Sequence, residues 1–168
     1  MEHAADRSGR PNDPFVQLER SHRRLEDACD ALSIAARDRD IETVTNICAF
    51  FARQVRRHEE DEELSLFPRL TSAGARAIIE GLAREHREHE ALHARLERAA
   101  SGRSEEGETP RDQWSEIETI AEELRRRYRV HIEREEKELF PTARQLLSPG
   151  ALDEVLKEMS TRRGRERG

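Results

Sequence analysis

The chain has 168 residues, of which 35% are hydrophobic and 39% are charged, and its formal net charge is -6. This length is typical of one domain. The negative charge excludes a whole-molecule positive field and so argues against nucleic acid or an anionic membrane surface as a partner. No apolar run approaches the ~20 residues that cross a bilayer, and the first residues lack a signal-peptide pattern, so we expect a cytoplasmic protein.

The first helix is predicted to begin at Asp13-Pro14, a capping acid followed by proline at the first helical position. Apolar side chains then recur in steps of three and four over residues 15–36, which is the spacing of one helix face. This helix is expected to end at about Arg37, and residues 1–12 before it are expected to be disordered.

Three further helices are predicted from the same spacing. Asp40 can cap the second, which is expected to end near Pro68 because proline follows its last apolar residues. The third covers residues 79–100 and is followed by a polar loop rich in Gly, Ser and Pro. Pro110 opens the fourth, which repeats the second and is expected to end near Pro141.

Four such helices with short connections predict an all-α fold, an antiparallel up-down-up-down four-helix bundle over residues 13–146. A short additional C-terminal helix is expected over residues 147–162, before a disordered basic tail at 163–168. Two alternatives stay open for the apolar face of this last helix. It packs on the bundle, or it binds a second copy or a regulatory protein partner.

Two offsets relate the halves of the chain. The motif His-x-x-x-Glu begins at residue 58 and recurs 73 residues later at residue 131, each time followed by Leu-Phe-Pro. An offset of 64 pairs His22 with His86 and aligns the apolar residues around them. The first and third helices, and the second and fourth, are therefore pseudo-equivalent.

Each of the four helices carries histidine, or histidine with glutamate, on its apolar face. Antiparallel packing is expected to bring these polar side chains to one level of the bundle. Unpaired carboxylates in a core cost several kcal/mol, and two facing each other repel unless a cation neutralises them. Imidazole with carboxylate and no thiolate suits iron or manganese, and we take iron as the better interpretation. The candidate ligands are His22, His58, Glu62, His86, His131 and Glu135.

Other residues on these seams have less certain roles. His89 is a candidate additional iron ligand or a proton donor beside the ligands, whereas His93 is expected to be structural. Tyr128 is expected to pack in the core, with a hydrogen bond that tunes the site as the alternative. Cys29 and Cys48 are interpreted as packing residues rather than as reactive thiols.

The sequence resembles the hemerythrin-like HHE cation-binding family over roughly residues 14–145. The resemblance rests on His22, on HEEDEELSLFP at 58–68, on LAREH at 82–86 and on HIEREEKELFP at 131–141. It implies two iron ions with two bridging carboxylates and a bridging oxo, hydroxo or water ligand. Oxygen-carrying members have a fifth histidine one turn from the third-helix ligand, where this chain has Leu82 and Glu90, so reversible oxygen carriage is not implied.

Three functions remain as hypotheses. The first is a domain that binds or senses dioxygen, nitric oxide, peroxide or iron through the di-iron site. The second is a di-iron enzyme with peroxidase, catalase-like or nitric oxide-reducing activity. The third is a metal-free helical interaction module. The first two need the same ligands, so the sequence does not separate them.

Overall fold

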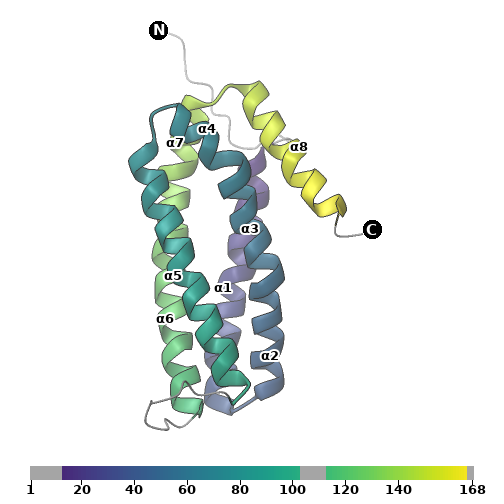
Figure 1. Ribbon diagram of the computed structural model, residues 1–168, viewed down its shortest axis with the longest axis vertical. Coiled ribbons are helices and arrows are strands. Elements are labelled where there is room, and N and C mark those ends of the chain that lie inside the picture. Colours follow the sequence, from purple (N-terminus) through teal and green to yellow (C-terminus); the bar gives the residue numbers. More distant parts are fainter. Residues whose placement is uncertain (1–12, 103–112, 166–168) are drawn as a thin grey trace.

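The computed structural model describes residues 13–102 and 113–165, and this part of the chain is helical and contains no strand (Figure 1). In chain order the elements, with η for a π-helix, are α1 (Pro14–Asp38), α2 (Ile41–Phe50), η1 (Phe51–Val55), α3 (Arg56–Asp61), η2 (Glu62–Leu66), α4 (Phe67–Ser72), α5 (Arg76–Ala100), α6 (Gln113–Arg134), η3 (Glu135–Leu139), α7 (Phe140–Leu146) and α8 (Pro149–Arg165).

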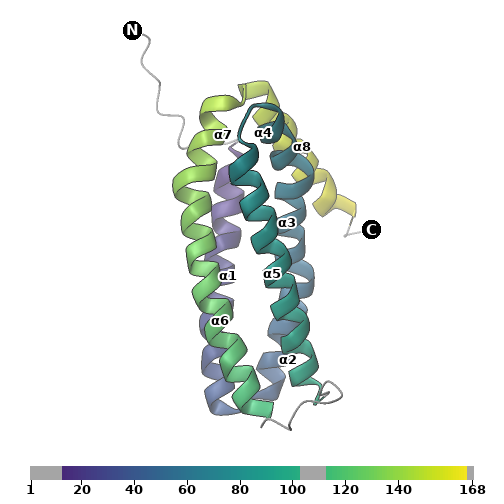
Figure 2. The ribbon, with the colours of Figure 1, turned by 60° about the vertical axis from the view of Figure 1, so that its left-hand side comes forward.

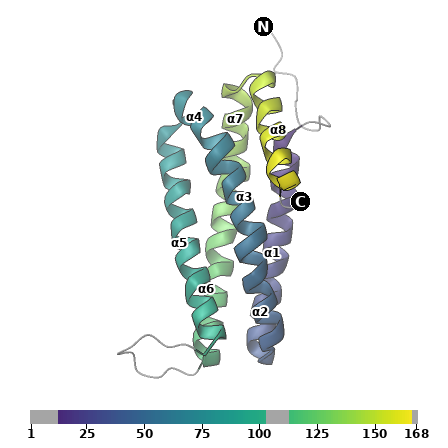
Figure 3. The ribbon, with the colours of Figure 1, turned by 45° about the vertical axis from the view of Figure 1, so that its right-hand side comes forward.

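The elements form four long rods and one added helix. The segment from α2 to α4 is one uninterrupted helix, and so is the segment from α6 to α7. Together with α1 and α5 they run alternately up and down, and α8 folds back from the upper end beside α1 and α3 (Figures 2 and 3). The predicted antiparallel bundle with an additional C-terminal helix is therefore confirmed.

Both predicted acidic caps are present. The carboxylate of Asp13 accepts a hydrogen bond of 2.9 Å from the backbone N–H of Phe15. Asp40 accepts one of 3.1 Å from the backbone N–H of Thr43. Each carboxylate satisfies an N–H group that has no partner within its helix, which explains where α1 and α2 begin.

The predicted helix ends at the two prolines are wrong, because the chain remains helical through Pro68 to Ser72 and through Pro141 to Leu146. A π-helix precedes each proline, and the N–H groups of Phe67 and Phe140 bond the carbonyls of Glu62 and Glu135, five residues earlier. Proline normally breaks a helix by lacking an N–H and by crowding the carbonyl four residues back. Here it stands in the first turn after the widened π turn, where its missing N–H is tolerated.

The core is divided into two apolar clusters. The lower cluster includes Leu25 and Leu92, and the upper one includes Leu18 and Leu82. His22 follows Leu18 on α1, and His86 follows Leu82 on α5, so the buried histidines lie between the two clusters. Apolar side chains therefore seal this level of the bundle from above and below.

The added helix α8 packs on the upper cluster through Val155 and Met159, which are both fully buried. The bundle therefore covers the core of this apolar face, and a second copy or a regulatory partner on the half-buried Leu152 stays a prediction. α8 extends to Arg165, beyond the expected end at residue 162. Arg163 bonds Asp61 on α3, and this contact keeps the last turn against the bundle.

Some expectations fall outside the described residues. These are the disorder predicted for residues 1–12, the polar loop with the helix start at Pro110, and the end of the basic tail at 166–168. Among the helices that are described, none has an apolar stretch long enough to pass through a lipid bilayer.

Candidate metal site

All six predicted ligands lie at one level of the bundle and form two groups. His22 and His58 form one group with Glu62 and Glu135, and His86 and His131 form the other with the same two carboxylates. Within each group one ligand atom per residue lies within 4.8 Å of every other, and all six residues are buried. Glu62 and Glu135 are thus shared between two adjacent sets of four ligand atoms, each with two imidazole nitrogens and two carboxylate oxygens.

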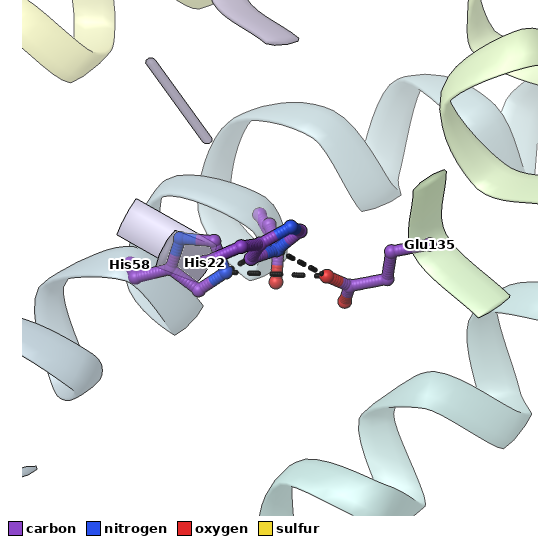
Figure 4. A group of neighbouring side chains, drawn as sticks. His22, His58 and Glu135 are labelled. Atoms are coloured by element: carbon purple, nitrogen blue, oxygen red, sulfur yellow. Dashed lines mark ion pairs between the residues drawn. The ribbon is translucent and has the colours of Figure 1, made fainter. Parts of the chain in front are cut away.

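The carboxylate of Glu135 lies between histidines from different helices. Its oxygens are 2.9 Å from Nε2 of His22, 2.9 Å from Nε2 of His131 and 4.0 Å from Nε2 of His58. Figure 4 shows His22 and His58 converging on Glu135. Glu62 is placed similarly, with its oxygens 3.3 Å from Nε2 of both His58 and His86.

These approaches are close, but they do not have hydrogen-bond geometry. All four carboxylate oxygens of Glu62 and Glu135 are buried without a hydrogen-bond partner, as are the Nε2 atoms of His22 and His86. Leaving so many buried polar atoms unsatisfied would cost several kcal/mol. Atoms that point at a shared position without bonding one another suit cations placed between them, so the residues present fit a dinuclear metal site.

Three further carboxylates hold the histidine rings from outside. Nδ1 of His22 is 2.9 Å from Glu136, and Nδ1 of His86 is 2.8 Å from Glu63. Nδ1 of His131 is 2.7 Å from Glu85. An ionised carboxylate only accepts hydrogen bonds, so each Nδ1 donates. In the neutral ring this directs the Nε2 lone pair toward the centre, which is the arrangement that metal-binding histidines require.

Aromatic rings close the upper side of the site. Phe140 stacks on His22 with a centroid distance of 5.7 Å, and Phe67 stacks on His86 at 5.7 Å. Both phenylalanines directly follow the π-helices that begin at Glu135 and Glu62. The widened turns therefore set the carboxylates and the rings above them together, as π-helical segments at functional sites often do.

The buried carboxylates and imidazoles strongly shift one another's pKa values. Burial alone would raise the pKa of Glu135, but His131 and His22 hold this pKa well below its usual range. Burial alone would lower the pKa of His86, but the surrounding carboxylates raise it to about 12. The pKa of His131 is raised to about 10 for the same reason. Metal binding at neutral pH must therefore displace protons from the ring nitrogens.

His89 lies beside the six residues but belongs to neither group. Its ring is 5.0 Å from that of His131 and 4.2 Å from that of Tyr128. Burial and the nearby positive charge of His131 lower its pKa to about 2, so the ring is neutral. Its role as an additional ligand stays a prediction.

Tyr128 and His93 form a separate polar pair in the lower cluster. The Tyr128 hydroxyl lies 2.8 Å from Nε2 of His93, whose other contacts include a stacked Phe51 ring at 4.4 Å. Burial lowers the pKa of His93 to about 4, so the ring is neutral and shares one hydrogen bond with the hydroxyl. Tyr128 is thus a packed core residue, as expected, and its hydroxyl bonds His93 rather than a candidate ligand.

The thiols take no part in this site. Cys29 is buried and Cys48 is half-buried in the lower cluster. Burial raises the pKa of the Cys29 thiol to about 12 and that of Cys48 to about 11, so both are protonated at neutral pH. This agrees with their interpretation as packing residues.

Sequence reasoning assigned no partner to Glu85 or Glu136, although each fixes a ring of the site. The internal repeat was a sequence signal for Glu136, because the offset of 73 aligns it with Glu63. Both carboxylates bond a histidine of a neighbouring helix. It also missed Asp61, a fully buried carboxylate that binds Arg162 and Arg163 of α8. In the sequence this acid is one of several in a charged run.

Comparison with known proteins agrees with this geometry. Among the curated proteins compared with this chain, none matches it. The family model of the hemerythrin HHE cation-binding domain matches residues 13–143, which is most of the chain and includes all six clustered residues and their outer carboxylates. The chain therefore belongs to the hemerythrin HHE cation-binding domain family.

Proposed function

We propose that this protein binds two iron ions and uses them to bind or sense a small oxidant, namely dioxygen, nitric oxide or peroxide. The observation that carries the proposal is the pair of buried groups that share Glu62 and Glu135. The proposed ligands are His22, His58, Glu62, His86, His131 and Glu135. The cytoplasmic location expected from the sequence belongs to the same proposal.

The donor set suits iron or manganese better than structural zinc. It offers four imidazoles and two carboxylates, and the described cysteines lie outside both groups. Nitrogen with oxygen and no sulfur suits iron or manganese, whereas structural zinc sites favour thiolates. Two carboxylates shared by two cation positions also balance much of the added charge, which stabilises a buried pair of divalent ions.

Each part of the chain has a role in the proposed function. A bound iron pair would supply redox-active centres for the chemistry of a small oxidant. Glu62 and Glu135 hold the two positions together, and the outer carboxylates keep the rings of His22, His86 and His131 turned inward. Phe67 and Phe140 exclude water from the upper side, which limits side reactions of a bound oxidant.

A decisive experiment combines metal content with spectroscopy. The protein is purified without oxygen, its iron is counted, and its visible spectrum is followed on exposure to air, peroxide and nitric oxide in turn. We expect about two irons per chain. A stable or reversible absorption band supports binding or sensing, whereas rapid consumption of peroxide or nitric oxide identifies the enzyme alternative.

Site variants test the ligand assignment. Glu135→Gln and His58→Ala should each lose most of the iron, while Glu138→Gln, an exposed residue one turn from Glu135, should keep both ions. His89→Leu separates its two proposed roles, because loss of iron would make it a ligand and an unchanged iron content would place it outside the coordination sphere. Full metal content in both Glu135→Gln and His58→Ala would refute the site.

A further inference from the structure

One of the four clustered histidines lacks an outer carboxylate. Nδ1 of His22, His86 and His131 each meets a glutamate, but Nδ1 of His58 is buried and has no hydrogen-bond partner among the described residues. His58 is only 6% exposed, so this nitrogen is largely removed from bulk solvent. A donor of this kind costs free energy unless something outside the chain accepts from it.

The internal repeat shows where the missing carboxylate would lie. Offsets of 73 and 64 relate the pair His131–Glu85 to the pair His58–Ser21. Serine is too short to reach as glutamate does, and it leaves space beside the ring. At the position where Glu85 of α5 supplies a carboxylate, α1 has the shorter Ser21, and we call the space left there the gap.

The surroundings of the two pairs also differ in charge. Beside Glu85, Arg134 donates a hydrogen bond of 2.6 Å to the carboxylate, and Gly81 leaves room for this guanidinium because a Cβ there would lie 2.7 Å from it. The offset of 73 puts Asp61, rather than an arginine, at the equivalent position next to His58. Arg163 of α8 reaches this acid instead, with a distance of 3.0 Å.

A cavity of about 190 Å³ lies at this gap, between α1, the second rod and α8. It is smaller than the ~300 Å³ at which pockets for drug-sized ligands begin, but it is many times the space that one water needs. The side chains that decide its chemistry are Arg20, Ser21, Arg24, Arg57, His58 and Arg163.

We propose that this cavity binds a small oxyanion, which accepts a hydrogen bond from His58 Nδ1 and so replaces the carboxylate that the chain lacks there. Four arginines line the same cavity as His58, and they provide the charge and the planar donors that phosphate and carboxylate groups bind. Asp61 offsets part of this charge through Arg162 and Arg163, whereas Arg20 and Arg24 are exposed at the mouth. The site adjoins the proposed metal centre through His58, whose Nε2 faces Glu62 at 3.3 Å.

Direct binding measurements test the oxyanion site. The full chain, as purified and again after metal removal, is titrated calorimetrically with inorganic phosphate and with citrate in a chloride buffer. Saturable binding of either at one site per chain supports the proposal, and the stronger of the two identifies phosphate or carboxylate as the preferred group. Absence of saturable binding by both would overturn it.

Matched variants locate the binding. Arg20→Gln with Arg24→Gln should weaken binding by about tenfold or more, since each removes a charge-assisted contact. Arg84→Gln with Arg87→Gln is the control, because it removes the same charge from two exposed arginines of α5, and the offset of 64 makes Arg84 the counterpart of Arg20. An equal loss in the control would mean that only general positive charge is being titrated, and would refute the site.

Ser21→Glu is the sharpest variant, because it restores the carboxylate that the other half possesses. We expect this variant to fold and to abolish oxyanion binding, with the new side chain accepting from His58. In histidine nitrogen NMR of the metal-free protein, phosphate should shift the His58 Nδ1 signal of the parent chain but not that of Ser21→Glu. Unchanged phosphate binding in Ser21→Glu would overturn the proposal, while iron content measured alongside shows separately whether the metal assignment holds.

Discussion

Replacing Asp61 by Asn should loosen the last turn of α8 from the bundle. The Asp61 carboxylate is fully buried and accepts from Arg162 at 2.9 Å and from Arg163 at 3.0 Å. Asparagine keeps the shape but removes the charge, so both charge-assisted bonds weaken and the side-chain amide faces two guanidinium groups that only donate. The loss should therefore fall mainly on the contact between α3 and α8.

The expected magnitude follows from the exposure of the partners. A hydrogen bond to a charged group contributes about 1.5–3 kcal/mol, which sets an upper limit of about 6 kcal/mol for the two. Arg162 and Arg163 are 19% and 27% exposed, so both can turn partly into water and recover some of this free energy. We expect a loss of about 2–4 kcal/mol, which for a chain of this size lowers the Tm by about 5–15 °C.

Thermal and urea unfolding of the metal-free protein measure the total effect, and hydrogen exchange shows whether the amides of α8 open first. Asp153→Asn, an exposed acid on α8 itself, is the control and should change stability by less than about 0.5 kcal/mol. If Asp61→Asn were as stable as this control, or if α8 kept its protection, the buried ion pairs would not be what holds the helix in place.

Three further outcomes are expected. Glu85→Gln should weaken iron binding about 10–100-fold, measured by chelator competition, whereas the exposed Glu90→Gln on the same helix should not. Tyr128→Phe should lower the free energy of unfolding by about 1–3 kcal/mol, because the buried His93 Nε2 loses its hydrogen-bond partner, yet iron content should stay unchanged. In the metal-free protein, the stabilisation that comes from His131 should be complete below its unfolded pKa of about 6.5 and disappear as the pH rises through about 10, since its folded pKa is raised. A urea midpoint that rises between pH 7 and pH 10 would contradict this sign.

The bundle and the ligand set could be predicted because both depend on spacing. The 3-4 steps fix which side chains share a helix face, and the two offsets show that His58 and His131 occupy equivalent places. The six residues then converge once the helices pack antiparallel. The two groups that share Glu62 and Glu135 consist of these six residues alone.

Two features could not be predicted from spacing. A π-helix widens one turn and leaves the apolar spacing on either side unchanged, so the spacing does not reveal it. Without this turn, Pro68 indicates the end of a helix. Glutamates such as Glu85 and Glu136 resemble the many exposed acids of a chain with 39% charged residues. The repeat singles out Glu136 through its counterpart Glu63, but Glu85 is distinguished only by its distance to His131 on another helix.

The histidine rings are not all held by carboxylates, and this difference affects the order in which the two metal positions bind an ion. His86 and His131 are both fixed by carboxylates of the chain, whereas of the other two rings only His22 is fixed in this way. The position served by His58 therefore requires more ordering when an ion arrives. At limiting iron, a form with one bound ion should accumulate and be visible in native mass spectra. With a mixture of two metals, the ion that binds more tightly should occupy the position of higher affinity first.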